Sequence, residues 1–353
     1  MNNQRIFADI HVIQTLPPSN VNRDDSGSPK TAQYGGVMRA RVSSQAWKMA
    51  IRKYFEAHSA ASLGLRTMRV AEYVAERIMS IDPNTGEEQA KKMAVKVLDK
   101  AGVKSNKDGL VKALFFIGSK QASALAEAAL RGETDEKVLK SALSDNPNID
   151  IALFGRMLAE DKSLNEDASA QVAHAISTHA VQTEFDYFTA IDEISKNAKM
   201  IDTIEYNSPT LYRYANVAMH ELTSQLGNAD SAVEALKLFV EAFSNSMPSG
   251  KINTFANATL PQVIMVNVRT DRPVNLVSAY EKPVKSTDGY VSESVRRLFA
   301  ELTNSEKFVE KPALTLFVSQ VDASNPPEGK EENSLKELLS DLDQIKPMIQ
   351  KEA

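Results

Sequence analysis

Alternating hydrophobic and polar positions predict β-strands near both ends of the chain. Residues 6–16 form a predicted strand with one hydrophobic face, made of Ile6, Ala8, Ile10 and Val12. Similar patterns predict strands over residues 37–42, 262–269 and 314–321, and a helix near residues 292–302 separates the last two. The core sheet is therefore split between the two ends of the chain.

The predicted strand over residues 37–42 leads directly into a helix. Because strand side chains alternate, one face packs through Met38, Ala40 and Val42. The other face is basic and carries Arg39 and Arg41. Ser43 or Ser44 then caps a helix that runs to about His58. Its buried stripe comprises Trp47, Ala50, Ile51 and Tyr54, while the opposite flank comprises Gln45, Lys48 and Arg52.

The middle of the chain changes character twice. Residues 64–180 are mainly helical by periodicity, with polar turns between the helices, which indicates a helical insertion or a second domain. Six aromatic residues then fall within about thirty positions, and the segment lacks clear periodicity, so we expect a long projecting loop there. Near the end, residues 334–348 predict a helix with a leucine-rich face that docks on this chain or on a partner.

Charge is unevenly distributed along the sequence. The net charge is −5, yet no acidic residue lies between Asp25 and Glu56, where six basic residues occur: Lys30, Arg39, Arg41, Lys48, Arg52 and Lys53. Helix N-termini attract phosphates, so this acid-free stretch favours binding of a sugar-phosphate backbone over a merely solvated basic face. There is no cysteine, no signal-peptide pattern and no run long enough to span a bilayer, which predicts a cytoplasmic protein without a membrane partner.

Catalytic and metal-binding patterns are weak. Asp24 and Asp25 resemble a nuclease carboxylate pair, but adjacent aspartates in a turn-rich loop favour a turn, which leaves Arg23 available to a phosphate. His174 and His179 are five residues apart, which does not suit a helical metal site, and phosphate-loop, dinucleotide and hydrolase motifs are absent. We therefore expect no catalytic residue, no metal and no cofactor.

The aromatic side chains of the 184–193 segment either stack on bases or belong to the core. The acidic residues of the same segment could meet the basic residues of a second copy.

Several blocks together carry a family resemblance: NRDD, YGGVMRARVSSQAWK, IALFGRML, EFDYFTAID, YRYANV and AYEKPV. They resemble the CasC family, the repeated backbone subunit of type I-E CRISPR Cascade complexes. The resemblance implies an α+β fold in which a modified RRM-like (ferredoxin-like) palm carries a helical fingers insertion and a projecting thumb loop. The implied boundaries are residues 1–60 plus 215–330 for the palm, 61–180 for the fingers, 181–214 for the thumb and 331–353 for a C-terminal helix.

The same resemblance implies a protein that holds RNA and does not cut it. Copies would stack along CRISPR RNA, present it for pairing with target DNA, and contact other Cascade subunits. Implied contacts to the RNA are Arg23, Lys30, Ser43, Gln45, Lys48 and Arg52, with Met157 near the guide and Phe188 near a displaced base, and Arg41 belongs with them on the basic strand face. Met38 and Met49 stand where relatives often have arginine, which removes charge from the surface. A metal-dependent ribonuclease using Asp24 and Asp25, and a general single-strand coat protein, remain alternatives.

Overall fold

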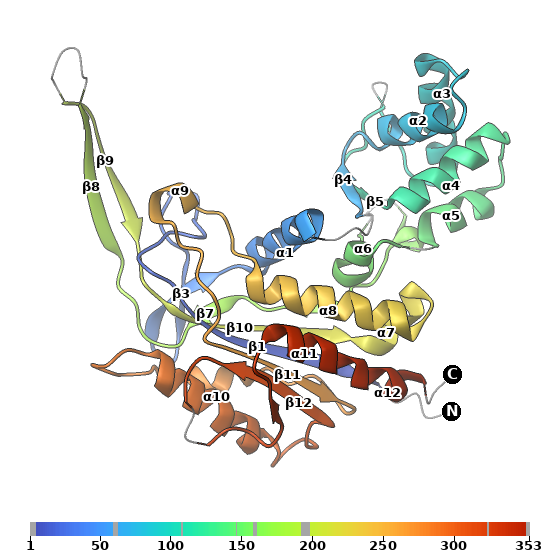
Figure 1. The fold of residues 1–353 in the computed structure, drawn as a ribbon. Helices are drawn as coiled ribbons and strands as arrows, with labels where there is room; N and C mark the ends of the chain where they lie inside the picture. Colours follow the sequence, from blue (N-terminus) through green and yellow to red (C-terminus); the bar gives the residue numbers. More distant parts are fainter. Residues whose placement is uncertain are drawn as a thin grey trace. The chain divides into compact units, whose positions relative to one another are not determined.

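The first predicted strand is buried on both faces in the computed structural model, which describes residues 5–58, 63–106, 109–145, 147–157, 161–191, 198–322 and 325–350. Strand β1 (Phe7–Thr15) is covered along almost its whole length, so it also buries the polar side chains of Asp9, His11 and Gln14. It pairs antiparallel with β11 (Val263–Arg269), from Phe7 opposite Arg269 to Ile13 opposite Val263. The two ends of the sequence therefore share one sheet, as predicted (Figure 1).

The chain divides into two compact units. The sheet unit comprises residues 1–54, 172–217 and 236–353, and the helical unit comprises residues 55–171 and 218–235. These units differ from the palm and fingers boundaries implied by the resemblance at residues 55–60, 172–180 and 218–235. Within the described residues, no helix is both long and apolar enough to cross a bilayer.

The sheet unit is built around the strand order β13-β12-β11-β1-β10-β7-β3-β2. The remaining strands of this order are β2 (Thr31–Tyr34), β3 (Val37–Val42), β7 (Ala175–Ser177), β10 (Thr210–Ala218), β12 (Leu314–Ser319) and β13 (Lys330–Glu331). The helices are α1 (Ser44–His58), α8 (Ala229–Asn245), which begins in the helical unit, α9 (Ile252–Phe255), α10 (Val291–Ser305), α11 (Leu335–Asp341) and α12 (Lys346–Gln350), with short 3-10 turns η2 (Leu276–Tyr280) and η3 (Leu342–Ile345).

Four central strands have the connectivity of a β-α-β-β-α-β fold. Along the chain they run β1, α1, β7, β10, α8, β11, and in space they are neighbours in the order β11-β1-β10-β7. This is the arrangement of ferredoxin-like folds, and it confirms the predicted α+β class. One face of the sheet packs on α10 and η2 through a cluster that includes Ile13, Tyr212 and Phe299.

The helical unit is a helix assembly with one two-stranded sheet, β4-β5, and it includes most of strand β6, which pairs with β10. Its elements are β4 (Leu65–Thr67), α2 (Val70–Ile81), α3 (Glu87–Lys100), β5 (Phe115–Ile117), α4 (Ser119–Leu130), α5 (Glu136–Ser144), α6 (Ile149–Phe154), η1 (Lys162–Leu164), β6 (Ala170–Val172) and α7 (Met219–Leu226). Its core is rich in alanine and valine, which lets helices α2, α3 and α4 pack together. Buried Arg156 holds the C-terminal part together by donating to the carbonyl oxygens of Leu164 and Leu143.

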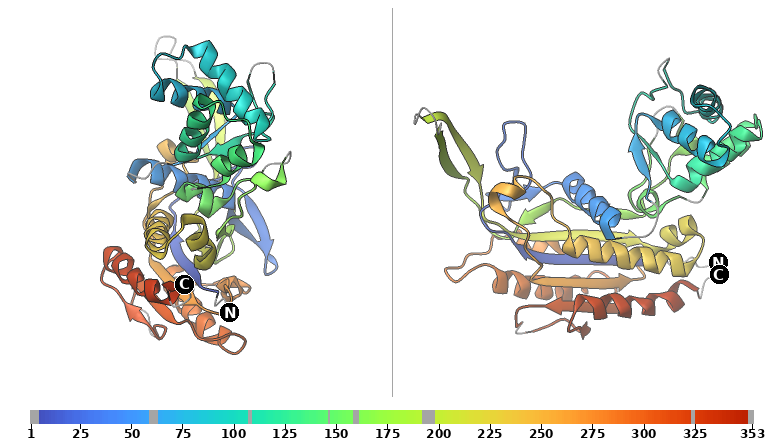
Figure 2. Two further views of the ribbon diagram at one scale, coloured as in Figure 1. Left: turned by 90° about the vertical axis from the view of Figure 1, so that its right-hand side faces the viewer. Right: turned by 45° about the horizontal axis from the view of Figure 1, so that its top comes forward.

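The expected thumb loop is wrong in one respect, because most of it is a β-hairpin. Strands β8 (Glu184–Ile191) and β9 (Ala198–Tyr206) pair antiparallel from Glu184 opposite Tyr206 onward, and they lie side by side in both figures (Figures 1 and 2). Both faces of the hairpin are largely exposed, so its sequence lacks the hydrophobic alternation that marks a half-buried strand. Asp192, Glu193 and the first part of the 195–208 segment lie outside the described residues.

The predicted C-terminal helix is also divided, into α11, η3 and α12, and Pro347 stands in the first turn of α12, a position that suits proline. Its leucine-rich face docks on this chain, with Leu338, Leu342 and Ile345 fully buried.

Candidate nucleic-acid interface

The N-terminus of α1 is capped by Ser43. Its Oγ accepts a hydrogen bond from the Ala46 backbone N–H at 3.3 Å, which decides between the two serines that the sequence offered. The Ser43 backbone N–H in turn donates to Oδ1 of Asn22 at 2.8 Å. Ser43 is 5% exposed, so its side chain serves the helix and helps to fix where the strand β3 ends and α1 begins.

Asn22 was not predicted as a site residue, yet it joins the preceding loop to α1. Besides accepting from Ser43, it accepts the Lys30 backbone N–H through its carbonyl oxygen at 2.9 Å. Arg23 and Pro29 form a bridge across the base of the loop, and the side chain of Arg23 is exposed. The loop that carries Arg23 and Lys30 is therefore hydrogen-bonded to the helix N-terminus.

The tip of this loop is a turn built on Asp24. Its Oδ1 accepts from Ser26 Oγ at 2.7 Å, Ser26 N at 2.9 Å and Ser28 N at 3.0 Å. These hydrogen bonds, the Ser26 hydroxyl first, hold the pKa of Asp24 below its usual value. The carboxylate thus forms the turn that the sequence favours, and no cluster of three or more metal-ligating side chains occurs in the described parts of the chain.

The prediction that Arg39 lies on an exposed basic face is wrong. Arg39 is 0% exposed, while Met38, predicted to pack, is 51% exposed. The guanidinium donates to the carbonyl oxygens of Tyr280 at 2.7 Å, Ser177 at 2.9 Å and Tyr34 at 3.2 Å. Burial lowers the pKa of Arg39. Ala40 and Val42 are buried as predicted. Chain from far away in the sequence also covers Arg39, so alternation fails at Met38 and Arg39 only.

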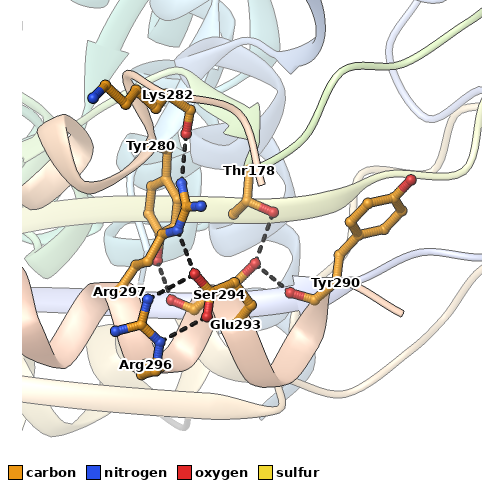
Figure 3. Close-up of polar contacts among 8 residues, drawn as sticks. All are labelled: Thr178, Tyr280, Lys282, Tyr290, Glu293, Ser294, Arg296 and Arg297. Atoms are coloured by element: carbon orange, nitrogen blue, oxygen red, sulfur yellow. Dashed lines mark hydrogen bonds and ion pairs between the residues drawn. The ribbon is translucent and has the colours of Figure 1, made fainter. Parts of the chain in front are cut away.

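Arg39 fixes the β2–β3 hairpin to a braced part of the sheet unit. The hairpin turns at Gly35 and Gly36, whose φ angles of 60° and 77° suit a two-residue turn, and a Cβ on Gly35 would lie 1.6 Å from the Glu281 carbonyl oxygen. Figure 3 shows how the receiving side is held: the Tyr280 hydroxyl donates to the Ser294 carbonyl at 2.8 Å, and Ser294 Oγ donates to Thr178 Oγ1 at 2.8 Å. Arg297 also donates to the Lys282 carbonyl at 2.7 Å.

Arg41 keeps its predicted place at the surface and gains an unpredicted neighbour. It donates through Nε to the Thr31 carbonyl at 3.1 Å and lies with Nη1 3.0 Å from Nδ1 of His174. Because a guanidinium has only donors, Nδ1 accepts and the His174 proton is on Nε2. Burial lowers the pKa of His174, and the charges of Arg41 and Lys30 lower it further. His174 therefore belongs to the same basic cluster, although its sequence spacing from Arg41 gives no signal.

Helix α1 presents the predicted flank. Gln45 and Lys53 are exposed, while Lys48 and Arg52, one turn apart, are partly exposed. The buried stripe is confirmed at Trp47, Ala50 and Ile51, but Tyr54 is only half-buried and its hydroxyl donates to Glu241 Oε1 at 2.9 Å. Met49, where the resemblance leads to an expected arginine, is 63% exposed.

A buried arginine anchors this helix to the sheet. The guanidinium of Arg213, on β10, lies 3.6 Å from the centroid of the Trp47 ring and 4.4 Å from that of Phe243. It also donates to Gln14 Oε1 and to the Phe243 carbonyl. Cation–π contact and hydrogen bonds together fix the side of α1 opposite Lys48 and Arg52.

Two predicted residues lie apart from this cluster. Met157 belongs to the helical unit and is 86% exposed. Phe188, on β8, pairs with Asp202 and is half-buried, whereas Phe185 and Tyr187 on the other face of the strand are more exposed. The structure thus brings together Arg23, Lys30, Arg41, Ser43, Gln45, Lys48 and Arg52 around one loop, one strand end and one helix N-terminus, which we call the basic surface.

Comparison with known proteins decides the family. The sequence model of the CT1975-like protein family matches residues 8–343. The chain belongs to this family. No curated protein matches the chain. Among solved structures, a chain described as "CRISPR RNA-guided surveillance complex, pre-nicking" is similar to this CT1975-like protein with 30% identity and a TM-score of 0.84, covering 97% of this chain and 100% of that chain.

A second solved chain, described as "CRISPR RNA-guided surveillance complex", has 28% identity and a TM-score of 0.73, covering 95% of this chain and 99% of that chain. Both matches span nearly the full length of the CT1975-like chain, so they include the sheet unit and the helical unit. The family and the α+β fold expected from the CasC resemblance are therefore confirmed.

Proposed function

We propose that this protein is a non-catalytic subunit of a CRISPR RNA-guided surveillance complex that grips the sugar-phosphate backbone of the guide RNA on its basic surface. The observation that carries the proposal is the hydrogen bond of Asn22 to the Ser43 N–H. It unites the Arg23–Lys30 loop, the Arg41 end of β3 and the N-terminus of α1 in one place. Similarity to chains of such complexes supports the assignment of the ligand.

The chemistry of the basic surface suits a backbone better than base edges. Lysine and arginine neutralise phosphates, and unpaired N–H groups at a helix start donate hydrogen bonds to anionic oxygens, without reading sequence. The 30 residues from 26 to 55 contain no acidic side chain, while the whole chain has a net charge of −5. The attraction is therefore local, which favours one bound strand over a general cationic coat.

The finer part of the proposal concerns assembly. Copies of the chain stack along the RNA, which is held with bases available to target DNA, and further subunits complete the complex. Met157 and Phe188 extend the RNA contact from the helical unit and the β8–β9 hairpin. Ser43 supports the surface as a helix cap.

Purification from the native source tests the proposal directly. The expected result is co-purification with RNA of uniform length whose sequences contain CRISPR spacers. RNA of random length and origin would support the alternative of a general single-strand coat protein, and absence of RNA would contradict the proposed function.

A metal-dependent ribonuclease is the second candidate, and the structure gives a reason to disfavour it. Asp24 Oδ1 is occupied by three hydrogen bonds of its turn, so a metal ion would have to compete with them. Incubation of the purified protein with guide RNA and Mg²⁺ or Mn²⁺ should leave the RNA intact. Divalent-dependent cleavage that disappears in Asp25→Ala would overturn the non-catalytic assignment.

A further inference from the structure

The segment 250–257 has a strained backbone at both ends of the short helix α9. Lys251 and Ala256 have φ angles of 50° and 47°, and they are the only non-glycine residues with positive φ in the described parts of the chain. Left-handed conformation is unfavourable for residues with a Cβ and persists only where the surroundings impose it. The position of Lys251 is therefore held by contacts outside the segment.

The main contact is with the loop that carries Arg23. A Cβ on Gly250 would lie 2.3 Å from the Val21 carbonyl oxygen and 2.8 Å from that of Asn20, so glycine alone lets the two backbones approach. α9 lies beside this loop in Figures 1 and 2. The segment 250–257 is thus an immediate neighbour of the basic surface.

Further contacts hold the segment in place. Asn257 is fully buried, and neither polar atom of its side chain has a partner among the described residues. Two residues later, Thr259 Oγ1 donates to the Thr15 carbonyl at 2.8 Å, and the Thr259 carbonyl accepts from Gln14 at 2.8 Å. The ring of Phe255 lies 5.8 Å from that of Tyr206, at the end of β9. This conformation is unfavourable because it buries an asparagine without hydrogen-bond partners and holds two residues in left-handed backbone. We therefore expect the segment to have a role beyond connecting α8 to β11.

Charge gives an independent observation. The two longest acid-free stretches of the sequence are residues 26–55, which contain most of the basic surface, and residues 242–270, which contain Lys251. They are distant in sequence, yet the fold places Gly250 directly against the loop that begins the first stretch. Among the described residues the Lys251 ammonium makes no hydrogen bond or ion pair, and the neighbouring Asn253 and Thr254 are exposed.

We infer that Lys251, with Asn253 and Thr254 beside it, forms a second contact for the same RNA backbone, next to Arg23. The inference rests on the proposed function and adds residues that neither the charge pattern near Arg41 nor the family resemblance assigned. The ammonium pairs with a phosphate, and the amide and hydroxyl hydrogen-bond to phosphate or ribose oxygens.

The test uses the full chain, a single-stranded oligouridine RNA and several salt concentrations. Lys251→Asn removes the charge but keeps a residue that tolerates the left-handed conformation, and Lys251→Arg keeps the charge. Lys251→Asn should weaken binding and reduce the magnitude of the salt slope by about 0.7, the value for one phosphate contact on a single strand. Lys251→Arg should retain most of the wild-type slope. Gly250→Ala should weaken binding too, because its Cβ displaces the segment from Val21.

Lys307→Asn is the matched control, because it makes the same charge change two residues after the end of α10 and should bind as wild type does. A Lys251→Asn protein that binds like Lys307→Asn contradicts the inference. The double variant Lys48→Ala plus Arg52→Ala, measured in parallel, distinguishes failure of this inference from failure of the proposed function. If the double variant loses RNA affinity and Lys251→Asn does not, the inference is wrong and the proposed function still holds. No effect in either protein contradicts the proposed function itself.

Discussion

Two arginines of β3 have opposite roles. Arg39 is fully buried and donates to four backbone carbonyls, so it holds the β2–β3 hairpin on the sheet unit. Arg41, two residues later, lies at the surface beside Lys30 and His174. Buried Arg213 resembles Arg39, because it anchors α1 from beneath. A count of basic residues in the sequence therefore overestimates the number of cations available to bind RNA, because some of them are buried and hold the elements of the basic surface in place.

Loss of the buried cation beneath α1 should have the largest effect on stability. Arg213→Met removes the contact with Trp47 and leaves Gln14 Oε1 and the Phe243 carbonyl without a donor. We expect a decrease of about 3–5 kcal/mol in the free energy of unfolding, measured by urea denaturation. A decrease below about 1 kcal/mol would show that the buried arginine is not an anchor.

Arg39→Met should come next. Four carbonyl oxygens lose their charged donor, and we expect a decrease of about 2–4 kcal/mol in the free energy of unfolding. Arg41→Met is the matched change at the partly exposed arginine of β3 and should cost about 1 kcal/mol or less. Equal destabilisation by the two variants would remove the contrast between the two arginines.

Two buried ionisable groups on β1, Asp9 and His11, should make stability depend on pH in opposite directions. Burial raises the pKa of Asp9 to about 7 although Tyr214 donates to it at 2.7 Å, and burial lowers the pKa of His11 to about 3. Because the pKa of Asp9 is higher in the folded than in the unfolded protein, Asp9 contributes stability at low pH, and this stability is lost as the pH rises from about 4 to 7. Because the pKa of His11 is lower in the folded protein, His11 contributes stability at neutral pH, and this stability is lost as the pH falls from about 6.5 to 3.

These two slopes have opposite sign, so they largely cancel between about pH 4 and 6.5 in the wild-type protein. In Asp9→Asn the effect of His11 is unopposed, so the free energy of unfolding should decrease as the pH is lowered. The slope should be steeper than in wild type by up to about 1.4 kcal/mol per pH unit. His11→Asn should do the reverse and lose stability as pH rises through this window. Urea denaturation at several pH values measures both slopes, and two variants with slopes of the same sign would contradict this account.

Local sequence patterns predicted the elements that depend on capping by a neighbouring residue or on a regular alternation of hydrophobic positions. The Ser43 cap, the helix α1 and the strands β1 and β11 follow from periodicity and capping chemistry. Arg39 was misplaced because its acceptors Ser177 and Tyr280 are 138 and 241 residues away. His174 gave no signal because it reaches Arg41 only through the pairing of β3 with β7. The β8–β9 hairpin was missed because exposed faces on both sides produce no hydrophobic alternation.

The salt dependence of RNA binding tests the central claim most directly. Lys48→Ala plus Arg52→Ala should leave the unfolding free energy within about 1 kcal/mol of wild type, because both side chains are partly exposed. On single-stranded RNA the plot of log affinity against log salt should lose about 1.4 in slope, the sum for two phosphate contacts. An unchanged slope in a folded double variant would contradict the account that the basic surface grips the RNA backbone.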